Sequence, residues 1–328
     1  RDVTGVQTCA LPISGVDFLN KLAAIVGPTA VGKTRIAIEV AKRLNAEIIS
    51  CDSMQIYRGL DIGTAKAGPM EQNGIVHHLI DVVDPDEEYS VARFQEQAKS
   101  IIEELNSRKR LPLLVGGTGL YYQALVDDYT FYPLESHQKI RRQWNNIIRE
   151  KGLGYAYNYL QSIDPGYAAT ISANDQKRIV RAIEVYQLTG QPFSALQTKS
   201  QQTYKLAIVG LYLEREQLYQ RINLRVEQML ANGLIKEVTV LRNKGYNLNH
   251  NSMQALGYKQ VFYYLEGFLG KEEMIDEIKR ETRRYAKRQL TWFRKDPRIC
   301  WINPGEYSDK ALLQENISSY IEGTLSAV

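Results

Sequence analysis

The stretch Gly27–Thr34 reads GPTAVGKT and fits the phosphate-loop pattern G-x-x-x-x-G-K-[ST]. Its glycines let backbone N–H groups turn toward anionic oxygens, and a following helix adds the positive end of its dipole. Lys33 supplies a positive charge, and the Thr34 hydroxyl is placed to ligate Mg²⁺. The alternative is a tight glycine turn. The pattern favours a polyphosphate site built from Gly27, Pro28, Thr29, Ala30, Val31, Gly32, Lys33 and Thr34.

A carboxylate follows the next apolar run. Asp52 comes directly after residues 48–51, and in a doubly wound parallel sheet this position lies beside the phosphate loop. Three roles are open: binding Mg²⁺ through water, capping the following turn, or acting as a general base. An ordinary ATPase would carry an Asp after another apolar run. The candidate run, residues 111–115, ends instead in Gly116 and Gly117, which weakens the ATPase interpretation.

The segment after Asp52 is polar and punctuated by glycine as far as Lys66. Gln55 carries the paired donor and acceptor that can read a base edge, and Tyr57 can stack on a base. An ordinary surface loop is the alternative.

Positive charge is concentrated in three predicted helices. A single basic helix is usually a solvated face, but three in a chain of net charge +4 favour a polyanionic partner. The three sets are Lys177, Arg178 and Arg181; Arg215, Arg221 and Arg225; and Lys279, Arg280, Arg283, Arg284, Lys287, Arg288, Arg294 and Lys295.

The elements that must position these residues alternate between strand and helix, which predicts an α/β fold with a parallel sheet flanked by helices. We expect a phosphate-loop core at residues 17–126 and 200–328, with a helical C-terminal region and an all-helical insertion at residues 127–199. Strands are predicted at residues 22–26, 47–51, 78–82, 111–115 and 206–212. Helices are predicted at residues 33–44, 91–108 with Ser90 as N-cap, 137–151, 154–162, 175–188, 215–231, 234–243, 252–265 and 272–295.

Composition excludes some classes of protein. With 44% hydrophobic residues the 328-residue chain can build a full core, yet it has no apolar run that could span a bilayer. Three cysteines form no metal or disulfide pattern, which indicates a reducing compartment, and we expect a cytoplasmic protein. We also expect it to act as a monomer and to have no membrane partner. Residues 1–14 resemble a translated sequencing-adaptor remnant, and we expect residues 1–16 to be a non-native, disordered leader.

Taken together, these motifs resemble the tRNA dimethylallyltransferase family. The similarity runs from about Lys21 to Trp301 and is carried by GPTAVGKT, DSMQIYRGLDIGTAK, HHLID, VGGTGLYYQAL, KRIVRAIEVYQLTG, LEREQLYQRINLRVEQML, MQALGYKQ and TRRYAKRQLTWFR. Two positions depart from the family pattern, Val31 and Ala67, and neither removes a functional group.

The resemblance implies a P-loop NTPase-like fold and transfer of a dimethylallyl group from dimethylallyl diphosphate to N6 of adenosine-37, in the anticodon stem-loop of tRNA. It implies that the phosphate loop grips the donor's diphosphate with Mg²⁺. It makes Asp52 the general base and places the Thr118 hydroxyl near the reacting centre. Lys33 with Arg221 or Arg225 would stabilise the leaving group. The implied tRNA contacts are Asp52, Ser53, Met54, Gln55, Arg141, Lys177, Arg178, Ile179, Val180, Arg181, Gln254, Ala255, Leu256, Gly257, Tyr258 and Lys259.

Three rival functions remain at this point. The same chemistry on free AMP or ADP would not need the basic helices. A nucleotide kinase on the same core would need a phosphate-clamping lid and an acceptor site. An RNA-binding module with a vestigial phosphate site would release no diphosphate.

Overall fold

The computed structural model describes residues 19–129, 131, 138–196 and 203–327, so the predicted leader at residues 1–16 lies outside the described part. A six-stranded sheet of order β3-β2-β4-β1-β5-β6 forms the centre, and each of its strand pairs is parallel. This confirms the predicted fold class. The strands are β1 (Asn20–Val26), β2 (Ala46–Cys51), β3 (His77–His78), β4 (Leu111–Gly116), β5 (Tyr204–Leu211) and β6 (Cys300–Ile302).

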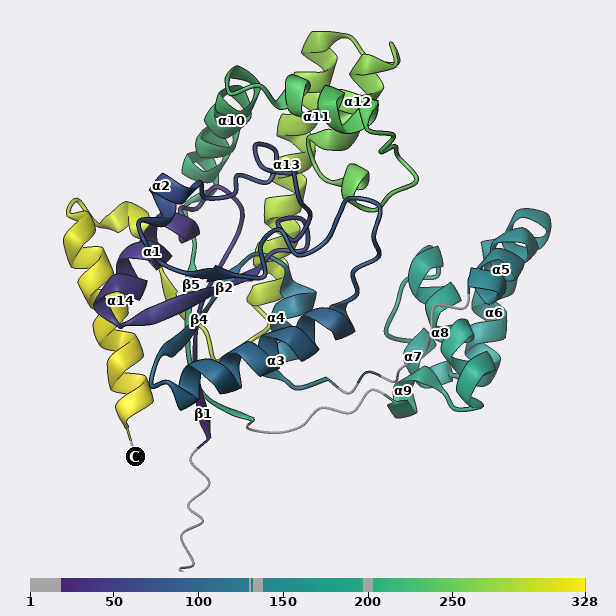
Figure 1. Cartoon of the computed structure of the whole chain (residues 1–328). Helices are drawn as coiled ribbons and strands as arrows, with labels where there is room; N and C mark the ends of the chain where they lie inside the picture. The colour runs from purple at the N-terminus through teal and green to yellow at the C-terminus, as the bar shows by residue number, and fades with distance from the viewer. Residues whose placement is uncertain (1–18, 130, 132–137, 197–202, 328) are drawn as a thin grey trace, which may run out of the picture.

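Helices cover both faces of this sheet (Figure 1). α1 (Lys33–Arg43) and α14 (Lys310–Ser326) pack on one face, and α3 (Val91–Ser107) and α4 (Gly119–Val126) pack on the other. β1 is buried between them because its apolar side chains alternate between the two faces. The Ser90 hydroxyl accepts from Arg93 N at 3.1 Å, which confirms the predicted N-cap of α3. A short helix, α2 (Pro69–Gln72), lies in the loop between β2 and β3.

Two strands differ from the prediction. β3 is two residues long, where residues 78–82 were expected to be extended, because Leu79 and Asp81 have φ values of 60° and 55° and interrupt the strand. β6 was not predicted, and the expectation that the chain is helical from residue 213 to its end is wrong at this point. A three-residue edge strand is too short to show periodicity, and its pairing with β5 creates it.

The C-terminal helices pack around a separate apolar cluster above the sheet (Figure 1). α10 (Arg215–Ala231), α11 (Leu234–Asn243), α12 (Tyr258–Leu265) and α13 (Lys271–Phe293) share an apolar cluster with loop residues Ile56, Tyr57 and Leu60. The helix expected at residues 252–265 is divided into the 3-10 turn Ser252–Gln254 and α12. The break falls at Gly257, whose φ of 91° does not continue a helix. A second 3-10 turn spans Pro304–Glu306.

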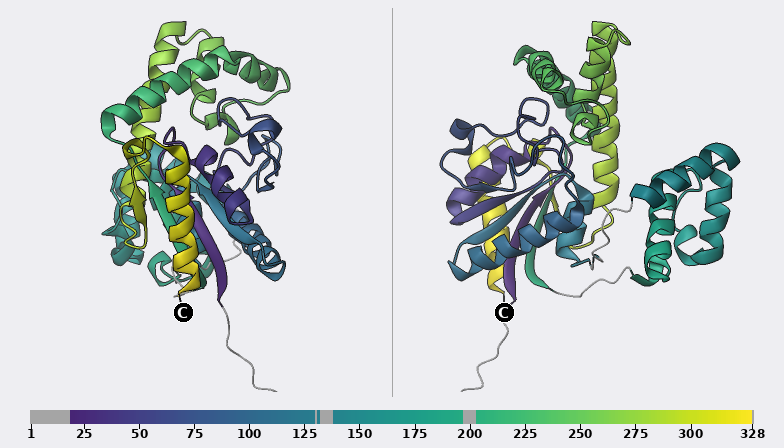
Figure 2. Two further views of the ribbon diagram at one scale, coloured as in Figure 1. Left: turned by 90° about the vertical axis from the view of Figure 1, so that its left-hand side faces the viewer. Right: turned by 45° about the vertical axis from the view of Figure 1, so that its right-hand side comes forward.

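The insertion helices pack on one another and lie apart from the sheet in Figures 1 and 2. They are α5 (Gln138–Lys151), α6 (Leu153–Ile163), α7 (Pro165–Ala168), α8 (Gln176–Thr189) and α9 (Phe193–Leu196). Their separate core includes Trp144, Leu160 and Ile183. The domain boundaries stay a prediction, since residues 197–202 lie outside the described part. Among the described helices, none is long and apolar enough to cross a lipid bilayer.

Candidate active site

The phosphate loop joins β1 to α1 at the carboxyl edge of the sheet. Gly27 has a φ of 147°, and a Cβ there would lie 2.4 Å from the carbonyl oxygen of Leu211. Gly32 has a φ of 101° and precedes α1 without a side-chain cap. The first N–H groups of α1 therefore have no capping side chain and can receive an anion. Only glycine suits both positions, which explains the spacing seen in the sequence.

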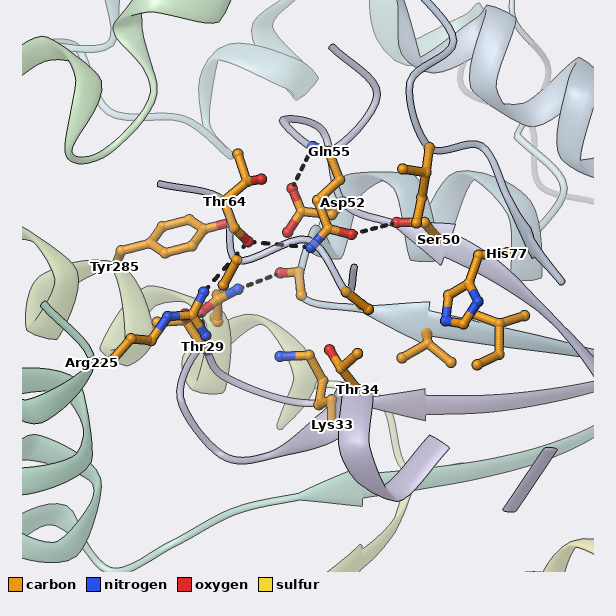
Figure 3. A pocket seen from close by; sticks show the side chains of 18 residues that line it. Thr29, Lys33, Thr34, Ser50, Asp52, Gln55, Thr64, His77, Arg225 and Tyr285 are labelled. Atoms are coloured by element: carbon orange, nitrogen blue, oxygen red, sulfur yellow. Dashed lines mark hydrogen bonds between the residues drawn. The ribbon is translucent and has the colours of Figure 1, made fainter. Parts of the chain in front are cut away.

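Lys33 points into the cavity beside this loop (Figure 3). Its Nζ donates to the carbonyl oxygens of Gly27 at 3.0 Å and Pro28 at 2.7 Å. Burial and the neighbouring Arg225 guanidinium lower the pKa of Lys33 from its ordinary value of 10.5 to about 7. The nearby Asp52 carboxylate does not offset the cost of burying the Lys33 ammonium beside Arg225. An anion bound in this cavity would raise the pKa of Lys33 and keep its side chain protonated.

Two arginines of α10 lie near the phosphate loop. Arg225 is half-buried, lines the cavity with Lys33, and has its Nη2 3.5 Å from the Thr64 carbonyl oxygen. Burial lowers the pKa of Arg225, and within the described residues it forms no ion pair. Arg221 is exposed, lies 3.4 Å from the Val31 carbonyl oxygen, and lines an outer opening that also reaches Lys33. Of the two arginines, Arg225 is therefore the one that lines this cavity together with Lys33.

Asp52 follows β2 and is the only carboxylate among the residues that line this cavity. Its Oδ1 accepts from the backbone N–H groups of Met54 at 2.9 Å and Gln55 at 3.3 Å, so the turn-capping role is present. Its Oδ2 has no hydrogen-bond partner in the part of the chain that the structure describes. Capping uses one oxygen and leaves the other for a proton or a metal-bound water.

The protein oxygens at this site suit an Mg²⁺ ion that takes most of its coordination from a bound phosphate group and water. The Thr34 hydroxyl and the Asp52 carboxylate line one cavity, and the described residues contain no cluster of three or more His, Cys, Asp or Glu that could hold a metal alone. Mg²⁺ commonly binds one or two protein oxygens and completes its shell with phosphates and water. The residues present fit that mode.

Thr118 stands on the second glycine-rich turn, at the start of α4. Its N–H donates to the Cys51 carbonyl at 3.1 Å, and its Oγ1 accepts from the Ser53 N–H at 3.0 Å. These bonds tie the turn after β4 to the turn that carries Asp52. The Tyr285 hydroxyl of α13 interacts with Thr118, and burial raises the pKa of Tyr285. At neutral pH this phenol is therefore a neutral hydrogen-bond donor.

The polar segment after Asp52 faces inward more than the sequence indicated. Gln55 lines the cavity, accepts from Ser50 Oγ at 3.0 Å, and donates to the Thr64 carbonyl at 3.2 Å. Tyr57 is only 2% exposed. The prediction that Tyr57 stacks on a base is therefore wrong in this structure, because its ring belongs to the apolar core.

A second cavity opens above the first and shares with it Thr29, Asp52, Thr64, Arg225 and Tyr285. Beyond these shared residues, its lining includes Ser53, Met54, Gln254, Ala255, Leu256, Gly257 and Arg288. Most of the predicted tRNA contacts on the core therefore surround one opening that leads to Asp52. The far end of the inner cavity is lined by Ile48, His77, Ile80 and Val115.

Some predicted contacts are not at this opening. Tyr258 is fully buried, and its hydroxyl donates to Glu237 on α11. Its side chain is thus unavailable to RNA. Lys259 is half-buried, with its Nζ 5.7 Å from the centre of the Tyr263 ring.

The insertion carries its own basic groove, lined by Arg141, Lys177 and Arg181. Arg141 and Arg181 lie 3.1 Å and 2.8 Å from the carboxylate of Glu184, which is fully buried. The predicted contacts Ile179 and Val180 are buried in the core of the insertion, at 0% and 6% exposure, and of the two Val180 also lines the groove. Arg178 is exposed and pairs with Asp175 at 3.3 Å.

The basic helix α13 is not one uniform stripe. Arg280 and Arg284 lie near Glu281, at 3.7 Å and 2.6 Å, whereas Arg288 has no acidic partner in the described residues and lines the upper opening. Gln289 also lies on this helix and hydrogen-bonds the phosphate loop, a role that the sequence reasoning missed. No local pattern marked this role, because Gln289 and Thr29 are 260 residues apart in the chain.

A family model described as IPP transferase matches residues 55–296. The tRNA dimethylallyltransferase of Syntrophomonas wolfei is 63% identical over 310 residues, which are 94% of this chain and 100% of that protein. The tRNA dimethylallyltransferase of Carboxydothermus hydrogenoformans is 48% identical over 302 residues, 91% of this chain and 97% of that protein.

Solved structures are similar over the same length. The tRNA isopentenylpyrophosphate transferase of Bacillus halodurans has a TM-score of 0.71 at 45% identity, covering 93% of this chain and 97% of that one. A eukaryotic dimethylallyltransferase acting on tRNA has a TM-score of 0.75 at 29% identity, covering 93% of this chain and 80% of that one. Because the family model matches most of the chain and closely similar relatives cover nearly all of it, the chain belongs to the tRNA dimethylallyltransferase family.

Proposed function

We propose that this chain transfers a dimethylallyl group from dimethylallyl diphosphate to N6 of adenosine-37 in tRNA, releasing diphosphate. One observation carries the proposal beyond family membership. Two half-buried cations, Lys33 and Arg225, line a cavity in which Asp52 is the only carboxylate among the lining residues, and a second opening leads to Asp52 from the side of Arg288. This arrangement suits an anionic donor below and a base from RNA above.

The donor's diphosphate would bind the uncapped start of α1 and the loop amides. Its charge would restore the ammonium of Lys33, whose pKa is lowered to about 7 in the absence of an anion. Thr34, whose hydroxyl lines the cavity, would hold Mg²⁺ beside the bound diphosphate. When bound, the metal supplies further neutralisation of the leaving group.

In the transfer step, adenine N6 attacks C1 of the dimethylallyl group as the bond from C1 to the diphosphate oxygen breaks. The N6 amine is a poor nucleophile because its lone pair is delocalised into the ring. Asp52 Oδ2, which the turn leaves unused, accepts the proton lost by N6, and such help is typically worth ~10²–10⁴ in rate. Lys33 and Arg225 stabilise the charge that develops on the leaving diphosphate.

The adenine must leave the anticodon stack to reach Asp52, at a cost of a few kcal/mol. The opening lined by Ser53, Met54, Gln254 and Leu256 would receive it, and Arg288 would contact the RNA backbone. The groove of Arg141, Lys177 and Arg181 would bind a second stretch of backbone. One chain supplies all of these groups, so we propose that the monomer is active.

Incubation with labelled dimethylallyl diphosphate and bulk tRNA, followed by nucleoside analysis, tests the proposal. We expect N6-dimethylallyladenosine from tRNA and none from AMP or ADP. Dimethylallyl diphosphate should also raise the melting temperature more than ATP does. Label transferred to a free nucleotide, or stabilisation by ATP alone, would contradict the assignment.

A further inference from the structure

Gln289 joins two loops that line the same cavity. It stands on α13 with 6% of its surface exposed. Its Oε1 accepts from the Thr29 N–H of the phosphate loop at 2.9 Å, and its Nε2 donates to the Gly117 carbonyl at 2.8 Å. Gly117 belongs to the turn that leads into Thr118. One amide therefore fixes the donor loop and the second glycine-rich turn to the same point.

The packing around this amide is close. A Cβ at Gly117 would lie 2.1 Å from Gln289 Nε2, so a side chain there would displace the amide from its present position. One turn earlier on α13, Tyr285 lines both cavities and interacts with Thr118. One turn later, Trp292 lies 2.4 Å from where a Cβ of Gly119 would stand. Three successive turns of α13 thus contact the two loops.

We propose that Gln289 is a positioning residue that sets the distance between the diphosphate site and the Asp52 base. The inference rests on the proposed function. The phosphate loop holds the leaving group, whereas Asp52 is tied to the second turn through Ser53 and Thr118. Because transfer requires both at once, a shift of about 1 Å between them can cost ~10²-fold in rate. The primary amide suits this position because it donates and accepts within one rigid plane.

The test compares Gln289→Met, which keeps the side-chain length and removes both hydrogen bonds, with Gln95→Met as a matched control. Gln95 is also 6% exposed and donates to the Ala124 carbonyl at 2.7 Å, but it lines neither cavity. Single-turnover rates are measured at saturating dimethylallyl diphosphate and tRNA, with tRNA affinity and unfolding measured in parallel. We expect Gln289→Met to lower the saturated rate ~10–100-fold and to change tRNA affinity less than about twofold, while Gln95→Met retains the wild-type rate.

A second pair of variants keeps the test independent of folding. Gly117→Ala should lower the saturated rate, because its methyl group displaces the Gln289 amide. In the Gln289→Ala background the close contact with the amide is removed and the nearest remaining neighbour given for this methyl group is the Gly27 carbonyl oxygen at 3.3 Å, so its addition should cost no more than about twofold. If the two residues contributed only to stability, their variants would change the free energy of unfolding and leave the saturated rate of the folded enzyme unchanged.

A saturated rate in Gln289→Met equal to that of wild type would overturn the proposal, as would an equal loss in Gln95→Met. So would additive losses in the Gly117 and Gln289 variants. The wild-type reaction separates this result from the proposed function: absence of product from the wild type removes that function, whereas equal rates remove only the role of Gln289.

Discussion

Replacing Lys33 with methionine is expected to stabilise the ligand-free protein while abolishing its response to diphosphate. Lys33 lies beside Arg225 in a cavity whose lining residues include one carboxylate, that of Asp52. Its pKa is lowered from 10.5 to about 7, chiefly by burial. A protein that keeps such a lysine sacrifices stability for a binding site.

The magnitude follows from linkage. In the unfolded chain Lys33 binds its proton up to about pH 10.5, but in the folded chain it loses it above about pH 7. Protonation of the unfolded chain therefore opposes folding by up to ~5 kcal/mol below pH 7, and this cost vanishes as the pH rises toward 10.5. The variant also loses two hydrogen bonds to Gly27 and Pro28, worth about 1 kcal/mol each. The net expectation is a variant more stable by ~2–3 kcal/mol at pH 7 and about equal to wild type near pH 9.

The assay is urea unfolding of wild type and Lys33→Met at several pH values between 6 and 9, with Lys236→Met as the control. Lys236 is exposed on α11, and its substitution should give a difference in unfolding free energy that does not change with pH. Inorganic diphosphate with Mg²⁺ is then added to each protein. It should raise the melting temperature of wild type and of Lys236→Met, but not that of Lys33→Met.

Two results would refute the reasoning. If the stability difference between wild type and Lys33→Met is the same at pH 6 and pH 9, the ammonium is not desolvated as the structure indicates. If Lys33→Met is less stable than wild type at pH 7, the contacts to the loop carbonyls outweigh the burial of the charge.

Three further predictions concern catalysis, RNA binding and the loop itself. Asp52→Asn should keep the oxygen that caps the turn and leave the affinities for dimethylallyl diphosphate and tRNA nearly unchanged, while kcat falls ~10²-fold or more. Recovery of the rate with added Mg²⁺ would show that Asp52 serves the metal instead. Arg288→Glu should weaken tRNA binding and lower the slope of log affinity against log salt concentration by about 0.7–0.9 per lost phosphate contact. Arg284→Glu should have a smaller effect because Arg284 is already paired with Glu281; equal effects would contradict the distinction between the paired Arg284 and Arg288. Gly27→Ala should destabilise the protein by ~2–4 kcal/mol in urea unfolding, because its Cβ would meet a β5 carbonyl at 2.4 Å, and unchanged stability would count against the close approach.

Much of the core could be predicted because its signals are local. The bounds of α10 and α11 agree with the sequence prediction at residues 215–231 and 234–243, where apolar spacing and glycine signals mark both ends. The phosphate loop was equally readable, since Gly27 and Gly32 are required by backbone conformation. By contrast, β3 was overestimated, because positive φ values at Leu79 and Asp81 leave no mark on the apolar pattern.

The sequence by itself determined the chemistry available to this protein: a phosphate loop, a carboxylate after β2 and an excess of basic helices. Only the tertiary structure decided which side chains of each motif face the site. It buried Tyr57 and Tyr258, separated Arg288 from the paired Arg284, and brought Gln289 onto the phosphate loop. The physical reason is that these outcomes depend on contacts between distant segments. Gln289 and Thr29 are 260 residues apart in the chain, and no local pattern specifies which face of a helix will meet a loop that far away.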